Sequence, residues 1–370
     1  MSTPVLTTEP VRGAFRHLPT LDGFRALAIL LVLIGHTLTF SLHLPGYWSE
    51  IGGGGVALFF VLSGFLITGL LCNKETVHGS IDLGGFYRDR ALRIFPAFYL
   101  LLVITAGLIA LKLVTDVPWY AVGVCALFLR NIAGRGDTLT HLWSLALEQQ
   151  FYVIWSLALW RVKCRNILPW AIGGAAVITL WRTVAITLHL WHYESGWYYV
   201  RTDFRIDSII IGSCLALVLY RPGDTARREY LRRKLEPVAR LAHPLWVFPA
   251  FIAWTVGVSL SVACRPFYVT GQMLLGSLML LNAVLSPPAF WARILTCAVM
   301  RRIGLYSYSL YLWQQIFLLQ KTPDWGWVRV FPFDLLCACA AGIASYHLIE
   351  RPFLKWKAAL KSQSASPHNT

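Results

Sequence analysis

Two ionisable residues, Arg25 and His36, lie within one long apolar segment at residues 21–40. About 20 apolar residues are needed for a helix to cross the ~30 Å hydrocarbon core of a membrane. A separation of eleven residues places both side chains on one helix face, roughly 16 Å apart along the axis. Because ionisable groups are costly in a membrane, they usually face a protein-lined cavity. The spacing fits a buried acid–base group and, equally well, a snorkelling arginine with a packing histidine.

A carboxylate and a second histidine lie in the apolar segment at residues 141–160. His141, Ser144 and Glu148 are spaced i, i+3 and i+7, so a helix would place all three on one face. A carboxylate within a membrane span indicates a catalytic or transport role more than helix packing. Glu148 is therefore a candidate catalytic residue that could orient His36. His141 is nearer the outer surface and is a candidate to contact a substrate that enters from outside.

Three arginines, Arg88, Arg90 and Arg93, precede or begin the apolar segment that starts near Ile94. In a helix, Arg90 and Arg93 lie one turn apart and can contact the same anion. Guanidinium groups bind phosphates through paired hydrogen bonds. The three arginines are therefore candidates to bind a phosphorylated substrate, and ordinary anchoring at the membrane surface or contact with anionic lipid is the alternative.

Two further groups of polar residues have both a packing and a functional interpretation. Ser63 and Gly64, within FFVLSGFLIT, favour close helix packing, and a catalytic or oxyanion-binding hydroxyl is the minority interpretation. Charges of alternating sign lie at the outer end of the span that begins near Ile206: Arg201, Asp203, Arg205 and Asp207. They either pair with one another or form an external polar site for a substrate that enters from outside.

The composition is that of a polytopic membrane protein. The 370 residues are 56% hydrophobic and only 14% charged, with a mean hydropathy of +0.57, whereas a soluble domain carries about a quarter charged residues. The formal charge of +15 is spread in short runs between apolar segments, a pattern that orients membrane helices rather than one that binds nucleic acid. The eight cysteines include no CxxC pair, so neither a disulfide framework nor a metal site is predicted.

The predicted fold class is all-α, a transmembrane bundle of about ten spans with a short re-entrant segment at 117–130. With this topology, 23 of the 33 lysines and arginines lie on the side of both termini, which the positive-inside rule makes cytoplasmic. The chain divides into an N-terminal tail at 1–20, a membrane domain at 21–353 and a polar tail at 354–370. The ten segments begin near residues 21, 56, 94, 141, 167, 207, 244, 268, 303 and 331.

Polar residues recur within apolar segments in a distinctive order: LDGFRALAILLVLIGH, FFVLSGFLIT, YRDRALRIFPAFYL, HLWSLALEQQFYVIW, RTDFRIDSIIIG, GLYSYSLYLWQQI and ASYHLIERPF. Together, from about residue 20 to 353, these segments resemble the acyltransferase-3 family of bacterial integral-membrane acyltransferases. The resemblance implies ten spans and transfer of an acyl group, often acetyl, from a cytoplasmic thioester donor. The implied acceptor is a hydroxyl of a surface or exported polysaccharide or glycolipid.

The resemblance also implies roles for particular residues. His36 is the essential catalytic group, Arg25 is its required partner, and Arg90 and Arg93 belong to the donor-binding cytoplasmic face. This chain has Gln314 where the family often has a histidine, and an amide cannot act as a base near neutral pH. Some members carry an extra soluble hydrolase-like domain. Here only a polar tail follows, so we expect the chain to act alone or with separate partners.

The predicted function is O-acyl transfer in a bacterial cytoplasmic membrane. No cofactor is expected to be bound; acyl-CoA, with acetyl-CoA as the expected form, is a co-substrate. The reference pKa of an imidazole is near 6.5, so neutral His36 is available at pH 7. It could take the proton of the acceptor hydroxyl as that oxygen attacks the thioester. A covalent acyl-enzyme on His36 or Ser63 is an alternative intermediate.

Other classes of function also fit the sequence. Ten spans with buried charges suit a transporter or flippase for a glycolipid or polysaccharide, although such a protein needs no cytoplasmic arginine cluster. An acyltransferase for a small-molecule acceptor is a further alternative. The expected partners are acyl-CoA, the acceptor, the lipid bilayer and polysaccharide-assembly proteins, and not nucleic acid.

Overall fold

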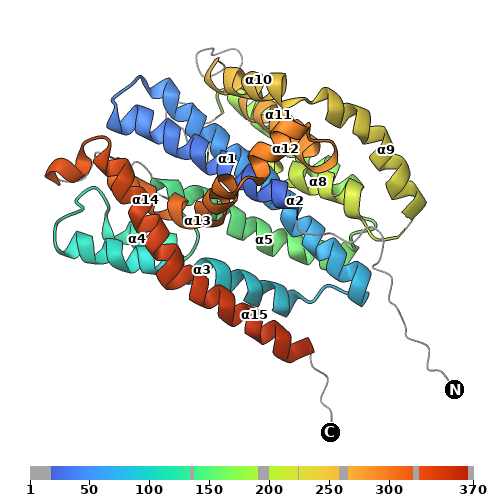
Figure 1. Ribbon diagram of the computed structural model, residues 1–370, viewed down its shortest axis with the longest axis horizontal. Coiled ribbons are helices and arrows are strands. Elements are labelled where there is room, and N and C mark those ends of the chain that lie inside the picture. Colours follow the sequence, from blue (N-terminus) through green and yellow to red (C-terminus); the bar gives the residue numbers. More distant parts are fainter. Residues whose placement is uncertain are drawn as a thin grey trace, which may run out of the picture.

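The computed structural model describes residues 18–133, 137–190, 200–223, 225–257, 266–319 and 325–365. Across these ranges the chain forms helices and no β-strand, which confirms the predicted all-α fold class. The long helices run along a common direction and form an elongated bundle (Figure 1). Most of the predicted N-terminal tail, residues 1–17, and the last residues, 366–370, lie outside the described residues.

A helix coincides with each of the ten predicted spans: α1 (Pro19–His36), α2 (Ser49–His78), α3 (Leu83–Ala110), α5 (Trp143–Val162), α6 (Leu168–Thr187), α8 (Asp207–Tyr220), α10 (Pro244–Gly257), α11 (Tyr268–Leu285), α13 (Ala298–Leu318) and α14 (Phe333–Ser345). Among the described residues, six helical stretches are long and apolar enough to cross a membrane: Pro19–Ser41, Gly46–His78, Leu83–Ala110, Leu168–Thr187, Tyr268–Leu285 and Phe333–Leu360. α8 and α10 are apolar but shorter. The chain is a multi-pass membrane protein, and the count of ten spans stays a prediction.

Shorter elements connect the long helices: α4 (Trp119–Ala126), α7 (Thr202–Arg205), α9 (Thr225–Leu241), α12 (Ala289–Thr296), and single turns at Gly46–Trp48, Thr140–Leu142 and Gly326–Arg329. The eight residues of α4 extend only ~12 Å, too short to cross a membrane. α9 lies between the predicted segments that begin near residues 207 and 244, where no span was predicted. Its helix is supported by two ion pairs one turn apart, Arg233 with Glu229 and Arg240 with Glu236.

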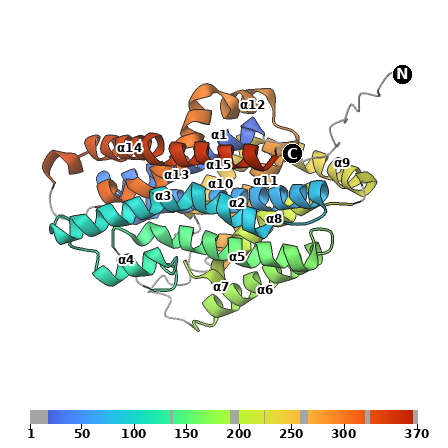
Figure 2. The same cartoon turned by 90° about the horizontal axis from the view of Figure 1, so that it is seen from below.

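The predicted domain boundary at residue 353 falls inside a continuous helical rod. α14 passes through a π-helical turn, η9 (Tyr346–Glu350), into α15 (Arg351–Ala365), and the three lie in line in Figure 2. The segment from residue 354, predicted as a polar tail, is helical as far as Ala365. Its alanine, leucine and lysine residues have high helix propensity. A second π-helical turn, η1 (Thr37–Ser41), directly follows His36. Such turns are rare and often lie at functional sites.

α2 is the central helix of the bundle. It is apolar on all sides and packs against α1, α8, α10 and α11, as expected for a buried helix. Glycines allow the closest approaches. A Cβ atom at Gly64 would lie 1.9 Å from the carbonyl oxygen of Ile209, and one at Gly55 would lie 2.5 Å from that of Ala28. Only glycine fits at these crossings, so Gly64 serves helix packing.

Candidate active site

A cavity of about 130 Å³ lies among α1, α2, α3, α5 and α13. A single water needs only ~10–15 Å³, so this cavity can admit part of a substrate. Its polar lining comes from residues far apart in the sequence: Arg25, Ser63, Arg90, Arg93, Ser144, Glu148, Tyr152, Ser307, Tyr308 and Tyr311. The rest of the lining is apolar, from leucine, isoleucine, valine and phenylalanine side chains. The bundle therefore encloses a polar site within apolar surroundings.

Three arginines contribute the positive charge of this cavity. Arg25 of α1 pairs with Asp22 at 3.1 Å, and its charged neighbours also include Arg93 and Arg90 of α3. Arg90 and Arg93 lie one turn apart, as predicted, because α3 begins well before them at Leu83. We refer to Arg25, Arg90 and Arg93 as the arginine cluster. Three guanidinium groups so close together are suited to bind a polyanion.

Arg88, the third arginine assigned to the donor site, does not join the arginine cluster. Its side chain is exposed and does not line the cavity. It is two residues before Arg90, so it points roughly 200° away around the helix axis. Because α3 is helical, two of the three predicted arginines line the cavity and the third faces away from it.

Glu148 lies at the arginine cluster. Its carboxylate faces the two arginines of α3 and the hydroxyl groups of Ser63 and Tyr152. Those two hydroxyl oxygens are 2.8 Å apart. The structure does not bring Glu148 to His36, contrary to the expectation that it orients the imidazole. The interactions of Glu148 are with groups of α2, α3 and α5, whereas the imidazole of His36 hydrogen-bonds Gln314 of α13.

Gln314 of α13 is the hydrogen-bond partner of His36. Nδ1–H of His36 donates to Oε1 of Gln314 at 2.7 Å, because an amide oxygen can only accept. Nε2 of the neutral imidazole is then the nitrogen that can accept a proton. It lies beside Gly52 of α2, where an added Cβ atom would come 3.3 Å from it. The glycine therefore leaves space at the basic nitrogen.

Tyr311 of α13 links the cavity to the region around His36. Its side chain lines the cavity, whereas His36 does not. The Tyr311 hydroxyl donates to the carbonyl oxygen of His141 at 2.8 Å and lies 2.5 Å from Oγ of Ser144. Because Tyr311 and Gln314 are one turn apart on α13, they share a helix face. A residue that lines the cavity and the residue that hydrogen-bonds His36 are therefore neighbours on α13.

His141 is 3% exposed, and both of its ring nitrogens contact protein oxygens. Nδ1 lies 3.0 Å from Oε1 of Gln315, and Nε2 lies 3.1 Å from the carbonyl oxygen of Leu312. Neither nitrogen is left for an acceptor hydroxyl. The structure therefore gives His141 a packing role in place of the acceptor-side position expected from the sequence.

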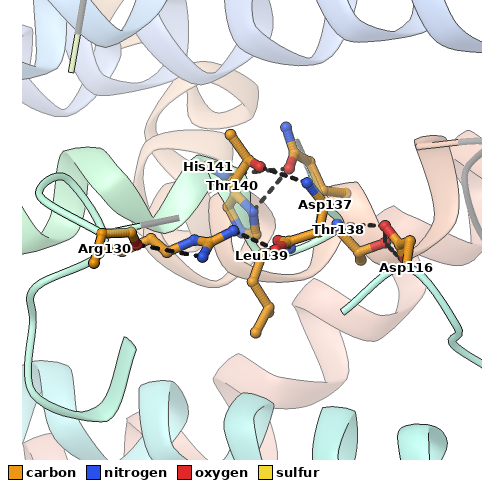
Figure 3. Close-up of polar contacts among 9 residues, drawn as sticks. Asp116, Arg130, Asp137, Thr138, Leu139, Thr140 and His141 are labelled. Carbon is orange, nitrogen blue, oxygen red and sulfur yellow. Dashed lines mark hydrogen bonds and ion pairs between the residues drawn. The ribbon is translucent and has the colours of Figure 1, made fainter. Parts of the chain in front are cut away.

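The turn that carries His141 is fixed by buried charges (Figure 3). Arg130 forms an ion pair with Asp137, and both side chains are buried. Thr138 donates to the Asp116 carboxylate through its backbone N–H at 2.7 Å and its hydroxyl at 2.9 Å. No sequence pattern distinguishes these residues, because they lie in loops between apolar segments, where polar residues are the rule.

The four charged residues near the start of α8 are separated and form no single external site. Arg201 and Asp203 pair with each other at 2.9 Å and are partly exposed. Asp207 pairs with Arg182 of α6 at 2.7 Å, and both are fully buried. Arg205 is also buried, and its guanidinium lies over two aromatic rings. The sequence did contain a signal for the buried pair, because Arg182 lies inside the predicted span at 167–188 and a buried cation requires a partner.

Sequence reasoning also missed the aromatic hydroxyls of the cavity and one carboxylate. Tyr152, Tyr308 and Tyr311 are typical of apolar segments, so no pattern distinguished them. The carboxylate is that of Glu350, on η9, which interacts electrostatically with Arg93. Among the described residues, no group of three or more His, Cys, Asp or Glu side chains could hold a metal ion.

Similarity to known proteins identifies the family of this chain. Residues 18–351 match the acyltransferase domain of the acyltransferase-3 family. The chain belongs to that family. The matched range includes the arginine cluster, His36 and Glu350, so the whole site lies within the acyltransferase-3 domain. No solved structure matches the chain.

Three bacterial proteins are similar to most of this acyltransferase-3 chain. It is 31% identical to YrhL of Bacillus subtilis, over 91% of this chain and 55% of the relative. It is 29% identical to the peptidoglycan O-acetyltransferase OatA of Listeria monocytogenes, over 84% of this chain and 51% of the relative. It is 28% identical to the O-acetyltransferase OatA of Staphylococcus aureus, over 92% and 58% respectively. The chain thus spans about half the length of these relatives.

Proposed function

We propose that this acyltransferase-3 chain is an O-acetyltransferase that moves an acetyl group from acetyl-CoA to a hydroxyl of a polysaccharide. One observation carries the proposal: a cavity with three arginines is joined through Tyr311 to a histidine whose Nε2 can accept a proton. A relative named as a peptidoglycan O-acetyltransferase supports the acetyl group and a polysaccharide acceptor. The donor is the phosphorylated thioester that the arginine cluster suits.

In this proposal the arginine cluster binds the phosphates of acetyl-CoA. Guanidinium–phosphate hydrogen bonds are charge-assisted and therefore stronger than neutral ones. Arg25 acts on the donor together with Arg90 and Arg93, rather than on the imidazole. The excess of cations on one side of the predicted topology supports donor entry from the cytoplasm. In Figure 1, α3 begins and α15 ends toward the same end of the bundle, which agrees with that orientation.

His36 is the general base of the transfer. Nε2 takes the proton of the acceptor hydroxyl as its oxygen attacks the carbonyl carbon of the thioester. The tetrahedral intermediate then collapses with cleavage of the carbon–sulfur bond. The CoA thiolate leaves and takes the proton from the imidazolium. Gln314 keeps Nδ1 protonated throughout, so the basic nitrogen always points at the acceptor. Base catalysis of this kind contributes ~10²–10⁴-fold to a rate.

The setting that fits this reaction is a bacterial cytoplasmic membrane. The donor enters from inside, the acceptor lies outside, and proteins of polysaccharide assembly are the expected partners. A transporter or flippase for a glycolipid would not need a histidine with an open Nε2 beside a site for a nucleotide donor. An acyltransferase for a small-molecule acceptor would use the same base and donor site. It would differ only in the molecule that binds from the outer side.

Labelled acetyl-CoA tests the reaction directly. Purified protein in lipid vesicles is incubated with acetyl-labelled acetyl-CoA and soluble peptidoglycan oligosaccharides. The proposal predicts label in an alkali-labile ester on the oligosaccharide, identified by mass spectrometry, together with free CoA. Protein-free vesicles are the control. Movement of a glycolipid across the bilayer with the acetyl group still on CoA would contradict the proposal and favour the transporter.

A further inference from the structure

Glu350 is a buried carboxylate for which the proposed reaction has given no role. It is the last residue of the π-helical turn η9 and is 2% exposed. The hydroxyl of Ser309, on α13, donates to its Oε2 at 2.9 Å. A carboxylate buried within a membrane protein is costly unless it is paired, and such residues usually serve function.

The charged partners of Glu350 belong to the arginine cluster. Its main electrostatic neighbour is Arg93, and Arg25 also acts on it. Arg93 and Arg25 repel each other as like charges. Each member of the cluster has a carboxylate nearby: Asp22 pairs with Arg25 at 3.1 Å, and Glu148 faces the arginines of α3. Glu350 is the carboxylate shared between α1 and α3.

The π-helical turn explains why a residue so late in the chain reaches this site. A π turn accommodates one residue more than an α-helical turn, so side chains after it are redirected. The neighbouring Arg351 is exposed, whereas Glu350 points into the bundle. The hydrogen bond from Ser309 of α13 fixes the carboxylate there. Because η9 packs against α3 and α13, the buried carboxylate lies within electrostatic reach of Arg93 and of Arg25.

We propose that Glu350 is a positioning residue for donor binding, which holds Arg93 and Arg25 side by side so that both contact the phosphates of acyl-CoA. This inference rests on the proposed function. Without the carboxylate, repulsion separates the two guanidinium groups, and they no longer converge on the same phosphates. Glu350 acts through the arginines and does not touch the reacting atoms.

Glu350→Gln tests the inference because it keeps the shape of the side chain and removes its charge. Acetyl-CoA binding is measured at equilibrium with purified protein, and kcat and KM are measured for acetyl-CoA and for acetyl-pantetheine, which lacks the nucleotide phosphates. We expect acetyl-CoA binding to weaken about tenfold, with KM raised and kcat nearly unchanged. The KM for acetyl-pantetheine should stay near that of the parent. Glu236→Gln, on the exposed face of α9, is the matched control.

A double-mutant cycle separates positioning from general destabilisation. In an Arg93→Gln background, adding Glu350→Gln should change acetyl-CoA binding by less than about twofold, because the effect passes through Arg93. Fully additive losses would overturn the inference. If Glu350→Gln does not fold, the same cycle is run with Glu350→Asp, and the same two outcomes decide.

Two further outcomes distinguish this inference from the proposed function. Parent-like acetyl-CoA binding by Glu350→Gln overturns the role of Glu350, while transfer by the parent protein leaves the proposed function standing. A parent protein that neither binds nor consumes acetyl-CoA contradicts the proposed function itself and removes the basis of the inference.

Discussion

Arg25 and His36 lie on one helix and belong to different parts of the site. Arg25 joins the arginine cluster in the cavity, whereas His36 is held by Gln314, 278 residues away in the sequence. Hydropathy could identify which ionisable residues lie within apolar segments, because their cost in a membrane makes them conspicuous. It could not identify their partners, since these depend on which helices pack together. The residue types were therefore predictable and their pairings were not.

Arg25→Gln should raise the KM for acetyl-CoA with little effect on kcat. One charge-assisted hydrogen bond to phosphate is worth ~1.5–3 kcal/mol, so the expected rise is roughly 10- to 100-fold. With acetyl-pantetheine as donor, the KM should hardly change, because the phosphates are missing. Arg88→Gln, on the exposed face of α3, should behave like the parent. An equal rise with both donors would show that Arg25 serves folding or the imidazole instead.

Gln314→Leu should lower kcat and leave the KM for acetyl-CoA near that of the parent. The leucine cannot accept from Nδ1–H of His36, so the imidazole loses its fixed tautomer and orientation. We expect a loss of about 10- to 100-fold, no more than the lower limit of the ~10²–10⁴-fold that a general base contributes, because the base is misoriented and not removed. Gln314→Glu retains an acceptor oxygen and should recover much of the activity. Steady-state kinetics with both variants check this, and equal losses would refute the orientation by Gln314.

At the scale of elements, hydropathy predicted the long helices and missed the polar ones. A helix coincides with each predicted span, yet α9 and α15 lie where no span was predicted. Both are rich in charged residues, so an apolar-segment criterion cannot find them. The π-helical turns η1 and η9 were equally invisible, because one extra residue in a turn leaves no compositional signal. η1 directly follows His36 and η9 ends at Glu350. Part of the site's geometry could therefore not be predicted from the sequence.

Gly64→Ala should destabilise the protein through the crossing of α2 and α8. The new Cβ atom would lie 1.9 Å from the carbonyl oxygen of Ile209, which forces the helices apart. Overpacking of this kind costs ~1–3 kcal/mol. Gly107→Ala on α3 is the control, because no atom lies within 4 Å of its Cβ position. Thermal unfolding of the detergent-purified variants should show a lower midpoint for Gly64→Ala only, and equal midpoints would contradict the close crossing.

At the scale of the whole molecule, charge and polarity define two ends of the bundle. The basic helix α9 and the end of α15 lie toward one end, and α4 lies at the other (Figures 1 and 2). Buried ion pairs such as Arg182 with Asp207 connect helices across the interior. The two-sided charge distribution follows from counting residues between apolar segments, and with the ten-span topology it stays a prediction. The sequence could not predict that the cavity and His36 are separate sites joined by Tyr311.

The central claim is that His36 takes the acceptor proton while the arginine cluster holds the donor. The most direct measurement is acetyl transfer by His36→Ala in sealed vesicles, with labelled acetyl-CoA inside and a peptidoglycan oligosaccharide outside, together with equilibrium binding of acetyl-CoA. We predict that transfer falls at least about 100-fold while acetyl-CoA binding stays within about twofold of the parent. Retention of more than about a tenth of the transfer rate would contradict the claim, because a general base contributes more than that.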